Sequence, residues 1–288
     1  MQTHLPTLLL REWMQHKRGW LIAALAPPLL FLAMLPIGSV QGLPDKHREL
    51  VALIIVMIST VAIYGICLLV ALFQLPGLAR RDTQDRSIEF WLSLPGRPSE
   101  SVAATVLAHA WLVPLGGAVI GMLFGVPIAM SVVAKQDGFG AITAVNWSEV
   151  MSAAAPLLVR AFAGTVPMLL WLSPLIFVLM AASAWLKRLG VPLVLVGSLI
   201  AVLVLDKIYG ISWPVDALQA WNLQVNTAMV HNPPGLQEAL MSDVNLWAWV
   251  AKDFGEALLE LVSLQFLGWA ALAAAGFTLV VMKRARGG

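Results

Sequence analysis

The segment 79–100 holds the densest group of charged side chains in this 288-residue chain. Its sequence, ARRDTQDRSIEFWLSLPGRPSE, places four basic and four acidic residues between two long apolar runs. Arg81 and Asp85 stand four positions apart, as do Asp82 and Arg86. Opposite charges at this spacing support an exposed helix. We therefore expect a charged helix in water, with side chains that another molecule can bind.

The second half of the same segment is more apolar than the first. Ile88, Trp91 and Leu92 fall at i, i+3 and i+4, which puts them on one face of a helix. A large aromatic side chain beside arginine is typical of an anchor in a protein–protein interface. The residues alone favour two interpretations equally. One is a surface offered to a partner protein, and the other is a solvated connector whose aromatic edge rests on lipid headgroups.

No other pattern in the sequence predicts a reactive site. The chain has no Gly-x-x-x-x-Gly-Lys-Ser/Thr loop for nucleotide phosphates and no His-Glu-x-x-His zinc motif, and its five histidines are scattered. His109 is the one histidine within an apolar run, where a neutral, hydrogen-bonded core residue is favoured over a proton or ligand site. The single cysteine, Cys67, is expected to pack as a small hydrophobic residue.

The composition predicts that these residues are carried by membrane helices. Hydrophobic residues make up 59% of the chain and charged residues 12%, against about 25% charged in soluble domains. Six apolar runs approach or exceed the roughly 20 residues that a membrane-crossing helix needs. The predicted spans are 20–40, 50–77, 101–134, 161–186, 189–205 and 261–282. We expect an all-α integral membrane protein that forms one domain over residues 1–288.

The distribution of basic residues predicts that both termini lie in the cytoplasm. This orientation places twelve of the eighteen basic residues on the cytoplasmic side, as the positive-inside rule requires. It also places the segment 78–98 in the cytoplasm, between the second and third spans. The charged residues nearest the spans are expected at span ends, in reach of water: Arg160, Asp206, Lys207 and Glu260. This scarcity of charge within the spans argues against an ion-coupled carrier.

Two further segments are predicted to lie along the membrane surface. Residues 5–18 form a short amphipathic helix at the inner interface, or simply a positively charged topology anchor. In the outer segment 206–260, apolar residues recur every three or four positions, which predicts one or two amphipathic helices before the last span. These outer helices would shape a substrate exit or merely cap the bundle, and the sequence does not decide between the two.

The run 85–95, DRSIEFWLSLP, resembles the first cytoplasmic loop of ABC-2 type exporter permeases. One branch of that family carries an Asp-Arg-Ser…Phe-Trp…Ser-Leu-Pro pattern between its second and third spans. The amphipathic N-terminal helix, the six spans with both ends inside and the outer segment before the last span agree with the family. The chain departs from it at Arg86-Ser87, where many members carry Gly-Thr.

The resemblance implies a permease of the bacterial cytoplasmic membrane that pairs with a second copy or a related permease. It would bind two ABC ATP-binding subunits, and those subunits would carry the ATP and magnesium. This chain would have no catalytic site, cofactor or metal of its own, and no nucleic-acid partner. The loop would form a coupling helix that docks on the ATPase. The residues carried over to that contact are Asp82, Asp85, Arg86, Ser87, Glu89 and Trp91.

Three other functions remain as alternatives. A non-transporting membrane anchor would use the same cytoplasmic helix to recruit an ATPase. An ion-coupled secondary carrier would need charged residues within the spans. A membrane-embedded enzyme would need a cluster of reactive residues that the sequence does not display.

Overall fold

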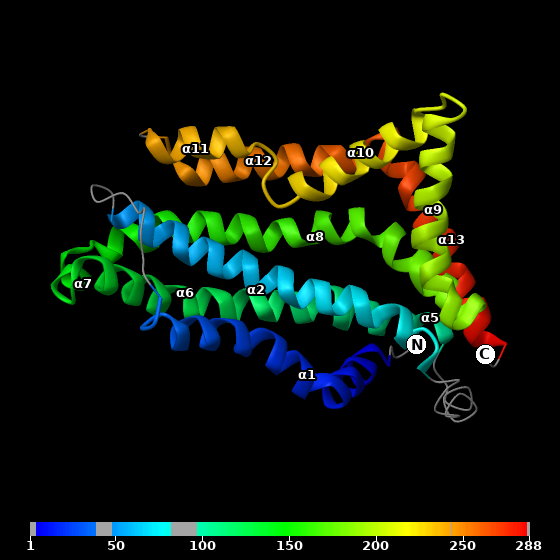
Figure 1. Cartoon of the computed structure of the whole chain (residues 1–288), viewed down its shortest axis with the longest axis horizontal. Helices are drawn as coiled ribbons and strands as arrows, with labels where there is room; N and C mark the ends of the chain where they lie inside the picture. The colour runs from blue at the N-terminus through cyan, green and yellow to red at the C-terminus, as the bar shows by residue number, and fades with distance from the viewer. Residues whose placement is uncertain (1–3, 39–47, 82–96, 243, 287–288) are drawn as a thin grey trace.

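The computed structural model describes residues 4–38, 48–81, 97–242 and 244–286, and within them every regular element is a helix (Figure 1). The N-terminal half comprises α1 (Leu5–Met34), α2 (Arg48–Leu78), α5 (Pro98–Val106), a π-helical turn (Leu107–Leu112), α6 (Val113–Asp137) and α7 (Gly140–Ala144). The C-terminal half comprises α8 (Trp147–Leu186), a 3-10 turn (Lys187–Leu189), α9 (Gly190–Lys207), α10 (Trp213–Thr227), α11 (Pro233–Met241), α12 (Leu246–Leu259), a 3-10 turn (Glu260–Val262) and α13 (Leu264–Ala285). The predicted all-α class is confirmed.

Five helical stretches among the described residues are long and apolar enough to cross a membrane. They are Leu5–Met34, Arg48–Leu78, Pro98–Asp137, Trp147–Lys207 and Leu264–Ala285. The count is one lower than the six predicted, because the stretch Trp147–Lys207 contains both predicted spans 161–186 and 189–205. The protein is thus a helical membrane protein with several candidate spans, and the sixth span stays a prediction.

A tight junction divides that longest stretch into α8 and α9. The turn Lys187–Leu189 separates the two helices, and Gly190 begins α9. A Cβ atom at Gly190 would collide with the backbone carbonyl oxygen of Ala182. Because only glycine lacks this atom, α9 can begin directly against the end of α8.

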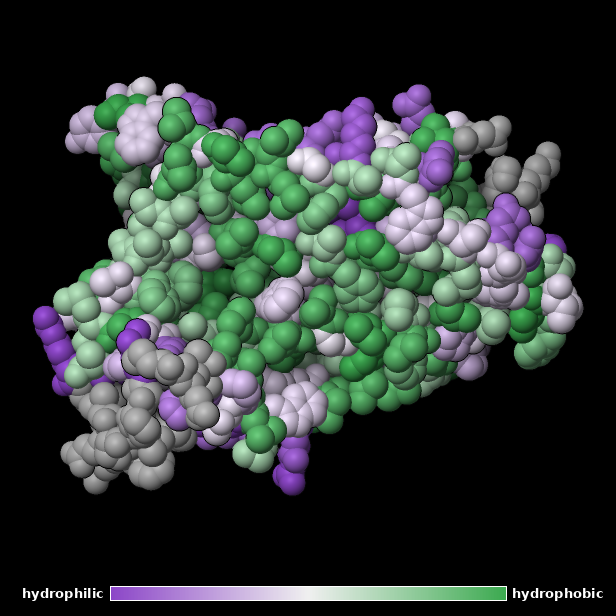
Figure 2. Space-filling view, turned by 180° about the vertical axis from the view of Figure 1, so that it is seen from behind, coloured by the Kyte–Doolittle hydropathy of each residue, from purple (hydrophilic) through white to green (hydrophobic). Residues whose placement is uncertain are grey.

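The long helices α1, α2, α6 and α8 run side by side, and α10–α12 form a layer along α8 (Figure 1). Helices α9 and α13 lie at the end of the bundle that carries both termini. On the face shown in Figure 2, apolar residues cover most of the middle and hydrophilic residues gather mainly towards the edges. An apolar surface of this extent is typical of contact with lipid.

Glycines bring α2 and α6 into close contact. Gly117, Gly121 and Gly125 recur every four residues along α6. A Cβ atom at Gly121 would lie 2.6 Å from the backbone oxygen of Ser59. Small residues at this spacing allow the backbones of membrane helices to approach closely. Cys67 faces Gly117 and is 1% exposed, which confirms its predicted role as a small packing residue.

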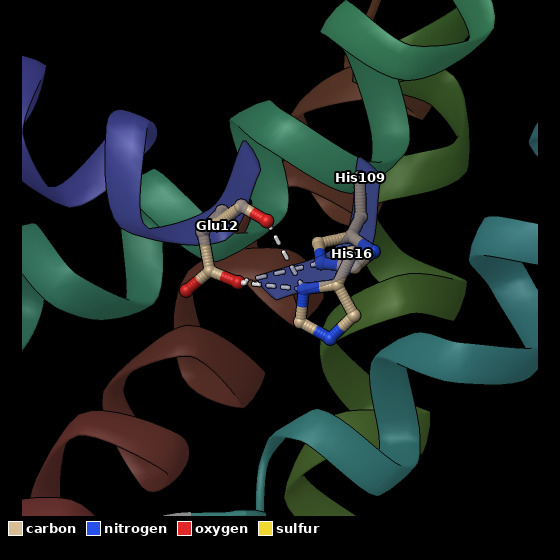
Figure 3. Close-up of side chains that lie close together, drawn as sticks. All are labelled: Glu12, His16 and His109. Atoms are coloured by element: carbon tan, nitrogen blue, oxygen red, sulfur yellow. Dashed lines mark hydrogen bonds and ion pairs between the residues drawn. The ribbon is translucent and has the colours of Figure 1, made fainter. Parts of the chain in front are cut away.

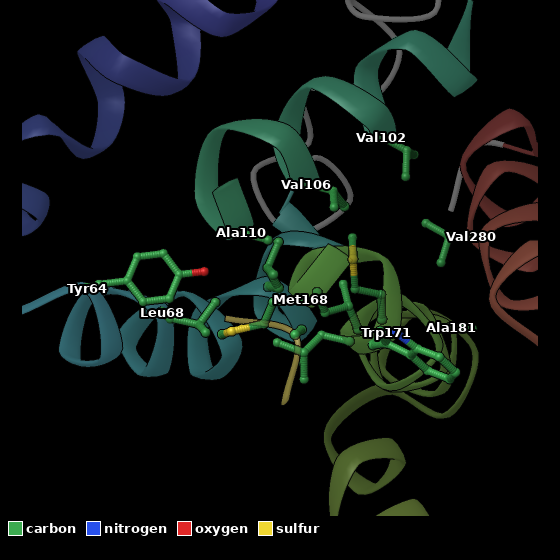
Figure 4. Close-up of a cluster of buried hydrophobic side chains, with 14 of the residues drawn as sticks. Tyr64, Leu68, Val102, Val106, Ala110, Met168, Trp171, Ala181 and Val280 are labelled. Carbon is green, nitrogen blue, oxygen red and sulfur yellow. The ribbon is translucent and has the colours of Figure 1, made fainter. Parts of the chain in front are cut away.

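A buried cluster joins the N-terminal helices to α8 and α13 (Figure 4). Trp171 of α8 is 1% exposed, and its ring meets that of Phe266 edge to face at 5.1 Å. Tyr64 and Leu68 come from α2, and Val280 comes from α13. Because α2, α5, α8 and α13 all contribute buried residues to this cluster, these helices are packed as one unit.

Two predicted boundaries differ from the structure. Residues 5–18 and the first predicted span form one continuous helix, α1, whose N-terminal turns bend relative to the rest (Figure 1). The helix continues through Gly19 because Trp20 is buried and stacks on His16, with ring centroids 5.7 Å apart. The outer segment contains three helices, α10, α11 and α12, where one or two were predicted.

Candidate functional site

The residues predicted to contact an ATPase are Asp82, Asp85, Arg86, Ser87, Glu89 and Trp91, and all lie outside the described residues. The structure does describe the two ends of this segment. Arg81 follows α2, and Arg97 precedes α5. Arg81 contacts a buried carboxylate on α1.

That carboxylate belongs to Glu12, whose side chain is 0% exposed. Its Oε1 accepts hydrogen bonds from Arg11 Nη2 at 2.6 Å, Arg81 Nη2 at 3.0 Å and Thr105 Oγ1 at 3.0 Å. Its Oε2 accepts from Arg81 Nη1 at 3.1 Å. Arg81 therefore binds both oxygens, which is the strong, orientation-specific form of an arginine–carboxylate pair.

Two imidazole rings complete the surroundings of Glu12 (Figure 3). The Nε2 atom of His109 lies 3.4 Å from Glu12 Oε2, and the His109 side chain is 0% exposed. The Nδ1 atom of His16 lies 3.7 Å from the same oxygen and 3.2 Å from the backbone oxygen of Glu12. His109 is thus buried, but the predicted hydrogen bond of its ring is not found among the described residues, and its Nε2 faces the Glu12 carboxylate.

A π-helical turn presents His109 to this site. The turn, Leu107–Leu112, interrupts the regular helix between α5 and α6. Within it, Trp111 Nε1 donates a hydrogen bond to Thr165 Oγ1 of α8 at 3.0 Å. The turn therefore contacts α1 through His109 and α8 through Trp111. Irregular turns of this kind occur often at functional sites.

The residues around this carboxylate come from three separate parts of the chain. We call them the Glu12 cluster: Arg11, Glu12, Arg81, Thr105 and His109. Arg81 comes before the segment 82–96, whereas Thr105 and His109 come after it. One carboxylate on α1 therefore binds α5, which follows that segment, and Arg81, which precedes it.

The cluster is better suited to ion pairing than to binding a metal ion. Glu12, His16 and His109 bring possible ligand atoms within 4.8 Å of one another, and carboxylate and imidazole are common zinc ligands. However, the guanidinium groups of Arg11 and Arg81 already hydrogen-bond to the carboxylate. A divalent cation here would stand beside two positive charges. The charge balance favours an ion-paired structural cluster.

A second buried ion pair corrects the prediction for Arg160. That residue was expected at a span end in reach of water, but its side chain is 1% exposed. The reason is that α8 begins well before the predicted span, so Arg160 lies inside the helix. Its Nε donates to Asp253 Oδ2 at 2.7 Å and its Nη1 to the backbone oxygen of Ala228 at 3.1 Å.

Asp253 in turn fixes the layer of outer helices. It lies on α12, and its Oδ1 and Oδ2 also accept hydrogen bonds from the backbone amides of Asn232 and His231 at 2.8 and 3.1 Å. The carboxylate thus ties α8, α12 and the start of α11 together. Like Glu12, it is an acid whose charge is met by an arginine and by further donors.

Neither of the two buried acids is predicted by a pattern in the sequence. Glu12 and His16 are four residues apart on one helix, which is a visible local pattern. The pairing of Glu12 with Arg81 joins residues 69 positions apart, and that of Arg160 with Asp253 joins residues 93 positions apart. No local pattern encodes such contacts.

Comparison of the chain with protein-family models, with curated proteins and with solved structures found no match.

Proposed function

We propose that this chain is the permease subunit of an ATP-driven exporter of the ABC-2 type. In this proposal six spans cross the bacterial cytoplasmic membrane, both termini lie inside, and two copies form the transport pathway with two separate ATPase subunits. The observation that carries the proposal is the sequence 85–95, DRSIEFWLSLP, placed between the second and third apolar helices. The lack of a phosphate-binding loop in the sequence supports an ATPase on another chain.

The Glu12 cluster supplies a physical route for coupling. An exporter of this kind must transmit movement of the ATPase from its docking segment to the spans. Arg81 and Thr105 lie on either side of the segment 82–96, and both donate hydrogen bonds to Glu12 of α1. Arg81 binds both oxygens of a buried carboxylate, which is a strong and orientation-specific contact. A push on the segment would therefore shift α1, α2 and α5 together.

The buried acids also bear on the ion-coupled alternative. Glu12 and Asp253 are the kind of residue that such a carrier uses. Each is bound by an arginine and by at least two further donors. A coupling acid must release and take up an ion in each cycle, which a carboxylate saturated by fixed donors does poorly. Their geometry favours structural ion pairs over ion-coupling sites. This argues against an ion-coupled carrier and so supports the permease proposal.

Extraction of the tagged chain from its native membranes tests the proposal. The expected result is co-purification of an ATP-hydrolysing subunit in equal copy number, visible as a second band and identified by mass spectrometry. Recovery of the chain alone would contradict it. ATPase turnover in nanodiscs with candidate cargo separates a permease, whose turnover responds to cargo, from an anchor, whose turnover does not.

A further inference from the structure

A cavity of about 520 Å³ lies between α2, α8 and the layer of α10–α12. Its volume falls within the range of about 300–1,000 Å³ found for small-molecule sites. The lining is almost wholly apolar and includes Met57, Leu157, Met168 and Leu236. The cavity is separate from the Glu12 cluster, with which it shares no lining residue.

One charged side chain, Arg160, is part of the cavity wall. Two of its nitrogens are already bonded, Nε to Asp253 and Nη1 to Ala228. The third, Nη2, is buried and has no hydrogen-bond partner within the described part of the chain. A buried donor without an acceptor is unfavourable, so an oxygen atom placed here by a ligand would stabilise it. Tyr64 and Asn226 also line the wall and offer further polar groups.

The rim of the cavity faces the side of the bundle. Ile54 and Ile58 of α2 line it and are 43% and 62% exposed. In a membrane protein such an exposed apolar rim faces lipid, so a ligand can enter from the bilayer. Along α2 the lining extends from Leu53 to Gly65, or about 18 Å at 1.5 Å per residue. The space is long and apolar, with a single cationic donor.

We propose that this cavity binds a long-chain amphiphile with an acidic head group. The apolar chain would lie along α2 and α8, and an oxygen of the head group would accept a hydrogen bond from Arg160 Nη2. This inference concerns binding alone, so it holds whether or not the chain works with an ATPase.

The first test asks whether the chain of the ligand occupies the cavity. Gly65 lines it, and a Cβ atom there would meet nothing within 4 Å. Gly65→Leu should therefore fill the cavity without disturbing its walls. The purified protein in nanodiscs would be labelled with photoactivatable palmitate, and the labelled peptides of α2 and α8 quantified by mass spectrometry. We expect at least a fivefold loss of labelling in Gly65→Leu.

Gly197→Leu on α9 is the matched control, because a Cβ atom there also meets nothing within 4 Å and the residue lies outside the cavity lining. Its labelling should equal that of the wild type. Unchanged labelling in Gly65→Leu, or an equal loss in both variants, would overturn the proposal.

The second test asks whether Arg160 recognises the head group. Wild-type protein should be labelled by photoactivatable palmitate at least tenfold more than by the matching hexadecanol, because a carboxylate forms a charge-assisted hydrogen bond. Arg160→Met alone would leave the Asp253 charge buried without its counter-charge, so the variant combines it with Asp253→Asn, which removes that charge and keeps an acceptor for the backbone amides of His231 and Asn232. This double variant should label equally with both probes. Equal labelling of the wild type, or a preference that survives in the double variant, would contradict the role of Arg160.

Discussion

Burial determines what Glu12 can do. An isolated carboxylate moved out of water is unfavourable by several kcal/mol or more, yet the Glu12 side chain is fully buried. The donors from Arg11, Arg81 and Thr105 offset this, since together they occupy both oxygens. Each of these donors therefore helps to offset the burial of the Glu12 charge.

Glu12→Gln keeps the shape of the side chain but removes its charge. Arg11 and Arg81 would then face a neutral amide, and loss of one partner from a buried pair typically destabilises by about 3–5 kcal/mol. We expect a clearly lower midpoint of thermal unfolding in detergent. Glu238→Gln, at an exposed position on α11, should leave the midpoint unchanged. A wild-type midpoint for Glu12→Gln would mean that the cluster contributes little to stability.

Asp253→Asn makes the corresponding test of the second ion pair. The amide oxygen can still accept backbone hydrogen bonds, but Arg160 loses its counter-charge, so a loss of about 3–5 kcal/mol is again expected. Adding Arg160→Met to Asp253→Asn removes the buried guanidinium that has lost its counter-charge and keeps the amide oxygen as an acceptor for the backbone amides, so the pair of changes should recover at least half of that loss. Glu256→Gln on the same helix, where the side chain is 40% exposed, is the control. Stability equal to wild type in Asp253→Asn would argue that the pair is not essential.

At the scale of elements, apolar runs predicted which helices exist but not where they end. The predicted span 161–186 covers only the C-terminal part of α8, whereas the helix itself begins at Trp147. Asn146 caps this start by accepting a hydrogen bond from the Glu149 amide at 3.3 Å, and the extension reaches the outer helices. The sequence alone singled out the segment 82–96, which lies next to Arg81 in the chain. It did not predict the Glu12 cluster, because the members of that cluster meet only when α1, α2 and α5 pack together.

Packing of α2 against α6 depends on the absence of side chains at three glycines. Gly121→Leu would force the leucine into the backbone of Ser59 and Thr60 on α2, so the two helices must separate. We expect a lower yield of monodisperse protein and a lower unfolding midpoint. Gly116→Leu, five residues away, is a matched control because its Cβ atom would meet nothing within 4 Å. Equal behaviour of the two variants would contradict the close packing of α2 and α6.

At the scale of the whole molecule, the proposed topology requires Trp147–Lys207 to cross the membrane twice. Arg188, in the exposed turn between α8 and α9, would then lie in the cytoplasm, and Lys252 of α12 would lie outside. A membrane-impermeant maleimide should label Arg188→Cys only in inverted vesicles and Lys252→Cys only in right-side-out cells. Background is low because the natural Cys67 is 1% exposed. Labelling of both positions from the same side would contradict six spans.

Within its described residues, the molecule consists of a bundle of apolar helices with two buried ion-paired sites. Apolar helices form the body, the Glu12 cluster joins α1 to Arg81 and to α5, and the buried pair of Arg160 and Asp253 fixes the outer layer. In the proposed exporter, the ATPase would act on the first of these ion-paired sites, and the outer layer would border the opposite end of the pathway.

The most direct test of the central claim is recovery of the ATPase with variants of the segment 82–96. Asp85→Lys reverses a charge in the predicted contact, and Trp91→Ala removes its aromatic anchor. Both should insert normally into the membrane but recover at least fivefold less ATPase than the wild type. Glu238→Lys and Trp213→Ala, at exposed positions on α11 and α10, should recover the wild-type amount. Wild-type recovery of the ATPase with both Asp85→Lys and Trp91→Ala, or no ATPase with the unmodified chain, would contradict the account.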